Sequence, residues 1–280
     1  MHQPFVQHLT QILGVTPKRL EALSGGLGSV YRVVLPDGKS VVAKLGDSLE
    51  VEAYMLRYLV EHSQLPVPRP LHTTDKVLVM EYIESDNSIT RSSEQHAAEL
   101  LALLHSIISP TFGLERDTVI GTLPQPNPPT DSWLTFFRDH RLRHMARTAA
   151  QSGRLPTIML GRIEHLASQI DRWLFEPPAP ALLHGDIWSG NVLTRHGRIA
   201  GLIDPAIYYG HPEIELAFIT LFNTFGDAFF ERYNDLHPIA DGFFEERRDL
   251  YNLYPLLVHV AIFGGGYVDS VDRTLRQFGF

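Results

Sequence analysis

The sequence predicts an α+β protein with two lobes, a small β-rich N-terminal lobe and a larger, mainly helical C-terminal lobe. Two observations predict it. Residues 29–45 alternate between apolar and polar positions on either side of a Pro-Asp-Gly turn, as the strands of a β-hairpin do. From Ser92 onward, most of the chain instead repeats its apolar residues with helical spacing. We place the lobes at residues 1–83 and 84–280, because a strand-like apolar run ends at Ile83.

The N-terminal lobe is expected to begin as helix and continue as sheet. Residues 2–22 are amphipathic, and Thr16-Pro17 is typical of a fresh helix start. A helix over residues 48–63 would place Ala53 on its apolar face. The other predicted segments are strands over 29–35 and 40–45, an extended connector over 65–70, and a buried strand over 77–83.

The C-terminal lobe is expected to be helical with a few short strands. Ser92 and Gln95 have the spacing of a capping box for a helix that ends at Ser106. The Pro-rich residues 123–131 predict a loop. Helices are predicted over 132–150, 162–175, 213–223, 228–236 and 243–263, with short strands near Leu182, near Val192 and over 199–203.

Composition narrows the class of protein and its partners. The formal net charge of −8 argues against a nucleic acid as the main partner. With no cysteine, the chain has no disulfide, no thiolate zinc site and no cysteine catalysis, and it fits a reducing cytoplasm. The N-terminus does not resemble a secretory signal, and the apolar runs are too short to span a bilayer. We therefore expect a cytoplasmic protein with no membrane partner, while its oligomeric state stays open.

The chemistry lies in the segment 184–191 and in the Ile-Asp-Pro run that follows it. Asp186 is followed five residues later by Asn191, and thirteen residues after that by Asp204. Either piece alone could be a simple turn, but protein kinases use this order of a catalytic Asp and then an Asn and an Asp that hold Mg²⁺. The pattern predicts an ATP-dependent kinase of bilobal, protein-kinase-like fold. Asp186 would orient the acceptor hydroxyl, and Asn191 and Asp204 would hold one or two Mg²⁺ ions.

A glycine-rich turn leads into the first strand of the hairpin. Gly25, Gly26 and Gly28 would let the backbone approach the ATP phosphates closely. The match to the kinase glycine loop is partial, because Leu23 stands where the first glycine would be. Hairpin glycines are common, so this turn is weak support when taken alone.

Lys44 ends the second strand of the hairpin and is expected to contact the α and β phosphates of ATP. On its own, a lysine at this place could equally be a surface residue. Its ion-pair partner is expected to be Glu52 rather than Glu50, because Glu52 shares the core-facing register of the next helix. The predicted strand over residues 77–83 resembles the hinge strand of kinases, where backbone groups bind adenine. The Glu81 carbonyl and the Ile83 amide are therefore expected to bind adenine.

The acceptor side is less well marked. Trp188 lies between the catalytic Asp and the Asn, where its side chain could either pack in the core or face the acceptor. Residues 264–266 are three consecutive glycines, which are costly inside a helix. They indicate either a close backbone approach or a helix end. Gly265 and Tyr267 are therefore candidate acceptor contacts, while His184 is expected to brace the catalytic loop.

The run LLHGDIWSGNV, followed by GLIDPAIYYGHPEIELAF, resembles the fructosamine kinase (ketosamine-3-kinase) family, whose fold is shared with aminoglycoside phosphotransferases and choline kinases. The resemblance covers almost the whole chain, including residues 52–56, 120–127 and 263–267. It implies ATP-dependent phosphorylation of the sugar 3-hydroxyl of small-molecule or protein-bound ketosamines, and hence deglycating repair. The chain departs from the family in having Glu215 where Asp is expected, and in lacking a cysteine in the glycine loop.

Two alternatives remain. The protein could be a kinase for another hydroxyl compound: an aminoglycoside enzyme would need several acidic residues around the acceptor, and a choline enzyme an aromatic cage. It could also be a pseudokinase that binds nucleotide without catalysis. The complete set of Lys44, Asp186, Asn191 and Asp204 argues against the pseudokinase, because a module that only binds has no use for a base.

Overall fold

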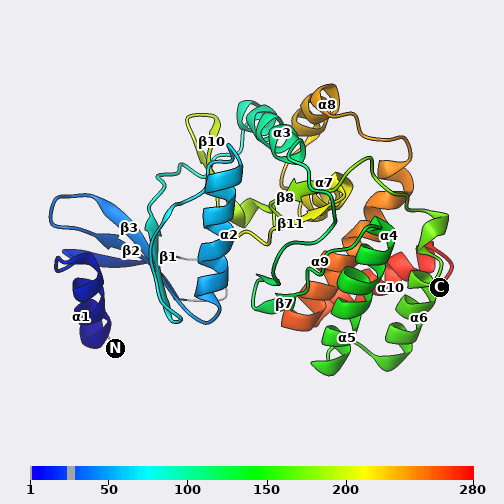
Figure 1. Ribbon diagram of the computed structural model, residues 1–280, viewed down its shortest axis with the longest axis horizontal. Coiled ribbons are helices and arrows are strands. Elements are labelled where there is room, and N and C mark those ends of the chain that lie inside the picture. Colours follow the sequence, from blue (N-terminus) through cyan, green and yellow to red (C-terminus); the bar gives the residue numbers. More distant parts are fainter. Residues whose placement is uncertain (1, 24–28) are drawn as a thin grey trace.

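The computed structural model describes residues 2–23 and 29–280 and shows a sheet-rich lobe beside a larger helical one (Figure 1). The smaller lobe holds a five-stranded antiparallel sheet in the order β1-β2-β3-β5-β4. Its strands are β1 (Arg19–Leu23), β2 (Ser29–Val34), β3 (Ser40–Leu45), β4 (Pro70–Thr73) and β5 (Val77–Glu81). Gly25, Gly26 and Gly28 lie outside the described residues, so their contact with phosphates stays a prediction.

Two helices cover opposite faces of this sheet. Along β3, Val41 and Ala43 join the small apolar cluster around Leu9 of α1 (His2–Leu13). Val42 points to the other face and joins the main core with residues of α2 (Leu49–His62). Alternation along the strand therefore puts Lys44 on the same face as Val42, toward the larger lobe.

The helix expected at the end of residues 2–22 is wrong. Helix α1 ends at Leu13, and the segment from Arg19 onward is strand β1. Its five residues pair in register with β2, from Arg19 opposite Val34 to Leu23 opposite Val30. Pairing along the edge of the hairpin satisfies the backbone of this segment, and this tertiary contact outweighs the local helix signal. The connector at 65–70 likewise runs into a strand, β4, that the sequence did not indicate.

The first helix of the larger lobe, α3 (Arg91–His105), is capped differently from the prediction. The N-cap is Thr90, whose hydroxyl accepts a hydrogen bond from the Ser93 amide. The Ser93 hydroxyl in turn accepts from the Thr90 amide at 2.7 Å. The capping box therefore uses Thr90 and Ser93 in place of Ser92 and Gln95, since the helix starts two residues earlier than expected.

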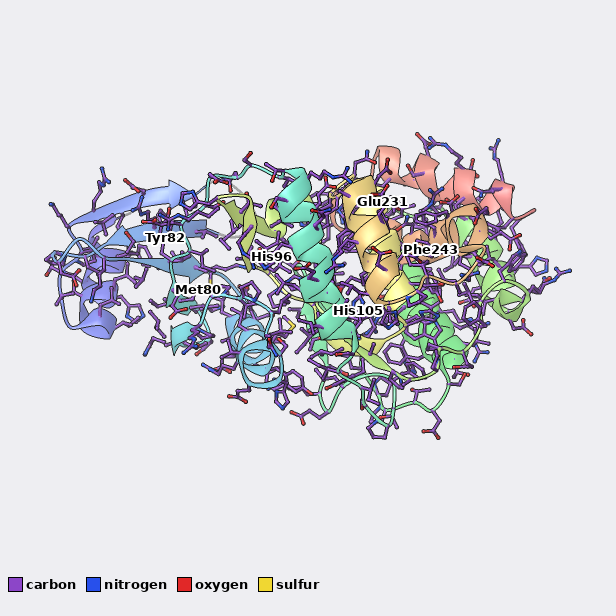
Figure 2. All side chains as sticks on the ribbon, turned by 90° about the horizontal axis from the view of Figure 1, so that it is seen from above. Met80, Tyr82, His96, His105, Glu231 and Phe243 are labelled. Carbon is purple, nitrogen blue, oxygen red and sulfur yellow. The ribbon has the colours of Figure 1, made fainter. Side chains whose placement is uncertain are left out.

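Helices form the body of the larger lobe, with short hairpins between them (Figure 1). Helix α9 packs against α5, α7 and α10, while α8 lies along α3. Figure 2 shows this second pair from above, with His96 and His105 on α3 and Glu231 on α8. The remaining helices are α4 (Trp133–Phe136), α5 (His144–Gln151), α6 (Thr157–Ala167), α7 (Pro212–Leu221), α8 (Asp227–Leu236), α9 (Arg248–Phe263) and α10 (Gly266–Gln277), with π-helical turns at Phe137–Arg143 and Phe243–Arg247.

Two further boundaries differ from the prediction. The Pro-rich loop at 123–131 begins as strand β7 (Leu123–Gln125), which pairs with β6 (Thr118–Ile120). The helix predicted at 162–175 starts earlier, right after Pro156, and gives way after Ala167 to a short 3-10 turn. The other short strands are β8 (Ala181–Leu183), β9 (Val192–Arg195), β10 (Arg198–Leu202) and β11 (Tyr208–Gly210).

The glycine run at 264–266 separates the last two helices. Gly264 and Gly265 have φ of 65° and 62°, a backbone conformation that other residues adopt only with strain. A Cβ added at Gly265 would meet nothing within 4 Å. Of the two explanations that the sequence left open, the structure shows the helix end. Among residues 2–23 and 29–280, no helix combines the length and apolar character needed to cross a membrane.

Candidate active site

Lys44, Glu52 and Asp204 form one cluster where the two lobes meet. The Lys44 Nζ lies 2.7 Å from the Glu52 carboxylate and 2.9 Å from Asp204 Oδ1. The expected Lys44–Glu52 ion pair is therefore present, and Glu50 is exposed to solvent. The strand supplies the lysine, the first turn of α2 supplies Glu52, and the larger lobe supplies Asp204.

Two carboxylates face a single ammonium in this cluster. Burial would lower the pKa of Lys44, but the charges of Glu52 and Asp204 raise it above its ordinary value. Burial and the neighbouring Asp204 raise the pKa of Glu52 to about 7, although Lys44 opposes the shift. The lysine is thus held in its charged form, and the cluster carries more negative than positive charge.

The backbone of Asp204 is itself strained. This residue follows β10 and has φ of 52°, in the left-handed region that a non-glycine residue occupies at a cost on the order of 1–2 kcal/mol. The turn directs the carboxylate toward Lys44 of the other lobe. Strain of this kind often accumulates at functional sites, which agrees with the role expected for Asp204.

Asp186 and Asn191 lie together on the loop after β8. The Asn191 Nδ2 donates to the Asp186 backbone carbonyl at 2.9 Å and to Asp186 Oδ2 at 3.0 Å. Gly185 precedes them with φ of 86°, and a Cβ there would lie 2.1 Å from the Ala206 carbonyl oxygen. Only glycine fits at this turn, which places the Asp186 side chain beside the amide of Asn191.

Two buried side chains, those of His184 and Glu215, hold this loop in place. His184 is fully buried, and its Nδ1 accepts from the Asp186 amide at 3.4 Å, which confirms its bracing role. The Glu215 carboxylate accepts from the backbone amides of His184 at 3.3 Å and of Gly185 at 2.5 Å. Glu215 therefore does the work of a structural anchor although an Asp was expected at this position.

His105 completes the anchor, and the sequence gave no sign of it. Its Nε2 lies 2.9 Å from Glu215 Oε2, and its Nδ1 lies 2.6 Å from the Tyr233 hydroxyl. Burial alone would raise the pKa of Glu215, but the bonds from His105 and the loop amide hold it below its ordinary value. The same burial lowers the pKa of His184 to about 4, so that ring stays neutral near pH 7.

The side chains of Asp186, Asn191 and Asp204 offer oxygen atoms that suit a divalent cation. Burial, followed by the charge of Asp204, raises the pKa of Asp186 to about 7. Asn191 uses its Nδ2 to hold Asp186, and the hydrogen bonds of the described residues leave its Oδ1 free as an oxygen donor. Within residues 2–23 and 29–280, no three acidic or histidine side chains gather as a complete metal cage. A hard cation that shares its coordination with phosphate oxygens fits this incomplete donor set.

The hinge strand presents backbone groups beside an apolar surface. The Glu81 amide donates to the Arg69 carbonyl at 3.0 Å, and among the described residues no hydrogen bond takes up the Ile83 amide. Ile83 packs closely on Gly201 of β10, where a Cβ would lie 2.4 Å from Ile83 Cδ1. Val42 lies on the same face of β3 as Lys44. It was not predicted as a candidate site residue, although side chains two positions apart in a strand share a face.

Trp188 lies at the edge of the loop and stays 36% exposed. Its indole covers Gly190, where a Cβ would approach a ring carbon to 2.3 Å. This contact explains why a glycine follows in the Trp-Ser-Gly segment. The Trp188 ring lies 6.2 Å from Phe222, a neighbour that the sequence did not suggest. Trp188 thus lies on the same loop as Asp186, two residues farther along the chain, with part of its surface open to solvent.

Tyr267 belongs to the same aromatic series. Its ring centroid is 4.8 Å from that of His259, which lies 5.0 Å from Phe222. Neither Phe222 nor His259 was predicted, because the spacing of α7 and α9 residues says nothing about which rings meet. The structure thus connects Trp188 and Tyr267 through two other rings. Contact of Gly265 with an acceptor stays a prediction.

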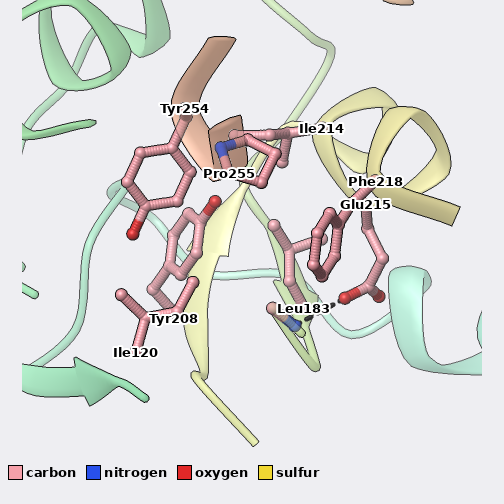
Figure 3. A pocket seen from close by; sticks show the side chains of 9 residues that line it. Ile120, Leu183, Tyr208, Ile214, Glu215, Phe218, Tyr254 and Pro255 are labelled. Carbon is pink, nitrogen blue, oxygen red and sulfur yellow. Dashed lines mark hydrogen bonds between the residues drawn. The ribbon is translucent and has the colours of Figure 1, made fainter. Parts of the chain in front are cut away.

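A small cavity of about 10 Å³ lies beside Gly185, with room for roughly one water molecule. Figure 3 shows Tyr208 and Tyr254 on one side of it, with Glu215 and Phe218 on the other. The Tyr254 hydroxyl donates to Gln125 Oε1 at 2.7 Å, and burial raises the pKa of Tyr254, with a smaller contribution from the charge of Asp186. These tyrosines line the interior next to the catalytic loop, and both lie in runs of sequence, 201–218 and 254–257, that resemble the family.

Comparisons of the sequence with known proteins identify its relatives. A family model described as fructosamine kinase matches residues 34–278. A probable ketoamine kinase of Synechocystis is 35% identical over 98% of this chain and 96% of its own length. The chloroplastic protein-ribulosamine 3-kinase of Arabidopsis thaliana is 32% identical over 92% of this chain and 83% of its own length.

Solved structures agree in fold. A proposed fructosamine-3-kinase from Thermobifida fusca superimposes with a TM-score of 0.84 at 30% identity, covering 97% of this chain and 98% of that one. The aminoglycoside phosphotransferase APH(4)-Ia, in complex with ADP and hygromycin B, gives a TM-score of 0.70 at 17% identity, covering 98% of this chain and 99% of that one. At that identity the second likeness establishes the protein-kinase-like fold and no more, and it confirms the fold class expected from the sequence.

Proposed function

Since this chain belongs to the fructosamine kinase family, we propose that it transfers the γ-phosphoryl group of ATP to the 3-hydroxyl of a ketosamine. The observation that carries the proposal is the convergence of four polar groups from both lobes. Lys44 contacts Asp204, and Asn191 holds Asp186. Protein kinases use the same residue types, in the same order along the chain, for phosphoryl transfer. The open face of Trp188 beside them provides a surface for a sugar.

The nucleotide is bound by the N-terminal lobe and the hinge. Lys44, held by Glu52, places the α and β phosphates. Adenine packs on the face of β3 that carries Val42, and its edge bonds to the Glu81 carbonyl and the Ile83 amide. The free Ile83 amide and the apolar surface beside it support this placement.

Asn191 and Asp204 hold magnesium. Support comes from the free Oδ1 of Asn191, the inward turn of Asp204 and the excess negative charge around Lys44. Bound there, magnesium would neutralise charge on the phosphates during transfer. The residues themselves contribute fixed oxygen donors, and Lys44 keeps Asp204 in place.

Asp186 acts on the acceptor. Its carboxylate orients the 3-hydroxyl of the sugar and takes up its proton as that oxygen bonds to the γ-phosphorus. The bond from phosphorus to the bridging oxygen breaks, and ADP leaves with the electron pair. Asn191 and the anchored loop keep the carboxylate in line, so that catalysis consists of positioning and charge neutralisation, with no covalent enzyme intermediate.

The product is a ketosamine 3-phosphate. In the family that this chain belongs to, such phosphorylation makes the adduct unstable, so that the amine is released. We propose the same deglycating role here, with the sugar and the amine as the two halves of one acceptor. The relatives named ketoamine kinase and protein-ribulosamine 3-kinase support a ketosamine as the acceptor class.

A matched acceptor panel tests the function. ADP release is measured with Mg²⁺-ATP and equal concentrations of a ribulosamine, a fructosamine, an aminoglycoside and choline. We expect turnover with the ketosamines far above that with the other two. Turnover of only the aminoglycoside or choline would replace the proposed acceptor and leave the kinase chemistry standing. ATP binding with no turnover of any acceptor would favour the pseudokinase.

A further inference from the structure

Four aromatic side chains form a continuous series that starts at the catalytic loop. We call Trp188, Phe222, His259 and Tyr267 the aromatic track. Successive ring centroids are 6.2, 5.0 and 4.8 Å apart, so each ring contacts the next. Phe263, 56% exposed, flanks the far end at 5.8 Å from His259. The track therefore starts on the catalytic loop, two residues after Asp186, and ends beside an exposed ring.

Each ring comes from a different element, and the fold holds them together. Phe222 caps the end of α7, His259 lies on α9, and Tyr267 is in the first turn of α10. The left-handed turn at Gly264 and Gly265 reverses the chain, so that α10 packs back on α9. The glycine run thus has a consequence beyond ending a helix, because it brings Tyr267 onto His259.

The track is apolar and carries no positive charge of its own near neutral pH. Burial lowers the pKa of His259, so its ring is neutral there. Its Nδ1 lies 2.8 Å from the Pro255 carbonyl, an acceptor, so the hydrogen is on Nδ1 and Nε2 is left without one. Phe222, His259 and Tyr267 are each half-buried. Faces of this kind attract an alkyl chain and a substituted ammonium group.

The track reaches farther than a sugar does. In a ketosamine the amine nitrogen is three bonds from C3, which puts it within roughly 5 Å of that carbon at bond lengths of about 1.5 Å. Trp188 follows Asp186 by two residues on the same loop, so an acceptor with its 3-hydroxyl at Asp186 and its nitrogen turned toward Trp188 would have that nitrogen at the start of the track. The rings beyond Trp188 can then meet only what is attached to the nitrogen. A secondary amine is a cation near neutral pH, and the face of an aromatic ring attracts a cation.

We propose that the aromatic track binds the amine half of the acceptor, with the ammonium group at Trp188 and an extended apolar chain along Phe222, His259 and Tyr267. The acceptors it fits are ketosamines of long-chain amines, such as a lysine side chain within a peptide. Ketosamines of short amines leave most of the track empty. This inference rests on the proposed function, and it assigns the part of the substrate that sets specificity.

The test is a series of ketosamines that share one sugar and differ only in the amine. The fructose adducts of methylamine, hexylamine and the Nε of N-acetyl-lysine amide are compared by kcat/KM at saturating Mg²⁺-ATP. The parent protein is expected to prefer the two long amines over methylamine by about 2- to 30-fold, the range of one or two aromatic contacts with a cation or apolar group.

Variants of the track should remove that preference. Tyr267→Ala and Phe222→Leu are expected to lower kcat/KM more for the long amines than for methylamine, mainly through KM. Tyr267→Phe keeps the ring and should keep the preference. Phe244→Ala is the matched control, because Phe244 is 41% exposed and its ring contacts are with Phe230 and Phe243 instead. Thermal unfolding of each variant shows whether a loss reflects misfolding.

The outcomes separate the two proposals. Equal kcat/KM for all three adducts in the parent would overturn the track proposal and leave the proposed function intact. So would a preference for long amines that survives both Tyr267→Ala and Phe222→Leu in folded protein. Failure of the parent to turn over any ketosamine would overturn the proposed function itself. Collapse of the preference in those two variants, with Tyr267→Phe and Phe244→Ala like the parent, supports the track.

Discussion

The two halves of this site are held together by different forces. On the side proposed to bind the nucleotide, the Lys44 ammonium lies within 3 Å of the carboxylates of both Glu52 and Asp204. On the side proposed to bind the acceptor, the aromatic track consists of rings that contact one another while part of their surface stays open. Ion pairs in a buried site demand one geometry, whereas ring contacts tolerate shape changes. The difference suggests that the first half fixes the reaction and the second half selects the acceptor.

Asp186 is the proposed catalytic base, and its substitution should cause the largest loss of activity. Asp186→Asn is expected to lower kcat by about 10²- to 10⁴-fold, because general-base contributions are of that size. Nucleotide binding should persist, since Lys44 and Glu52 are untouched. Steady-state turnover and ATP titration of the same preparation measure the two effects. The control is Asp235→Asn, an exposed Asp on α8, and a residual activity above about a tenth in Asp186→Asn would contradict the base role.

Lys44→Met should cause the next largest loss of activity. Its effect should be limited to the part of the site that is proposed to bind the nucleotide. We expect kcat to fall by about 10²- to 10³-fold, as when one preorganised electrostatic donor is removed. Glu52→Gln should cost less, because Lys44 retains Asp204 as a partner.

A double-mutant cycle of these two residues measures whether they act together. Since Glu52 works by holding Lys44, the loss in the double variant should be smaller than the sum of the two single losses. Strictly additive losses would mean that the 2.7 Å ion pair has no role in catalysis.

The residues of this site differ in how far the sequence alone could predict them. Asp186, Asn191 and Asp204 were found because their order and spacing along the chain reflect the chemistry, and Glu52 because helix register distinguishes it from Glu50. The anchor by His105 could not be found, since this residue lies 110 positions from Glu215 and no spacing relates them. Phe222 and His259 were missed for the same reason.

The errors in the fold have a similar origin. Residues from Arg19 onward carry a local helix signal, yet they form β1 because the adjacent hairpin offers an open edge. The N-cap was placed two residues too late because Thr90 and Ser92 are both suitable N-cap residues, and only the backbone decides between them. The larger outline was predictable because periodicity over many residues averages out such local ambiguity.

Asp204→Ala should sharpen the comparison on the metal side. We expect loss of the part of ATP affinity that depends on Mg²⁺, because one of two oxygen donors and its charge are removed. ATP is titrated with and without Mg²⁺ in parent and variant. Equal magnesium dependence in the two would remove Asp204 from the metal site.

Trp188→Ala should give the smallest effect and confine it to the acceptor half. The ketosamine KM is expected to rise by about 2- to 30-fold through loss of an aromatic face, with the ATP KM nearly unchanged. Initial rates over both substrates separate the two constants. A parallel rise in the ATP KM would show that the two halves are not independent, and unchanged ketosamine kinetics would remove Trp188 from the acceptor site.

The most direct test of the central claim is the position of the transferred phosphate. The protein is incubated with Mg²⁺-ATP and a fructosamine, and the product is examined by ³¹P NMR before the adduct breaks down. The account predicts a phosphate ester whose phosphorus couples to the proton on C3 of the sugar. A phosphate on any other hydroxyl, or inorganic phosphate alone, would contradict it.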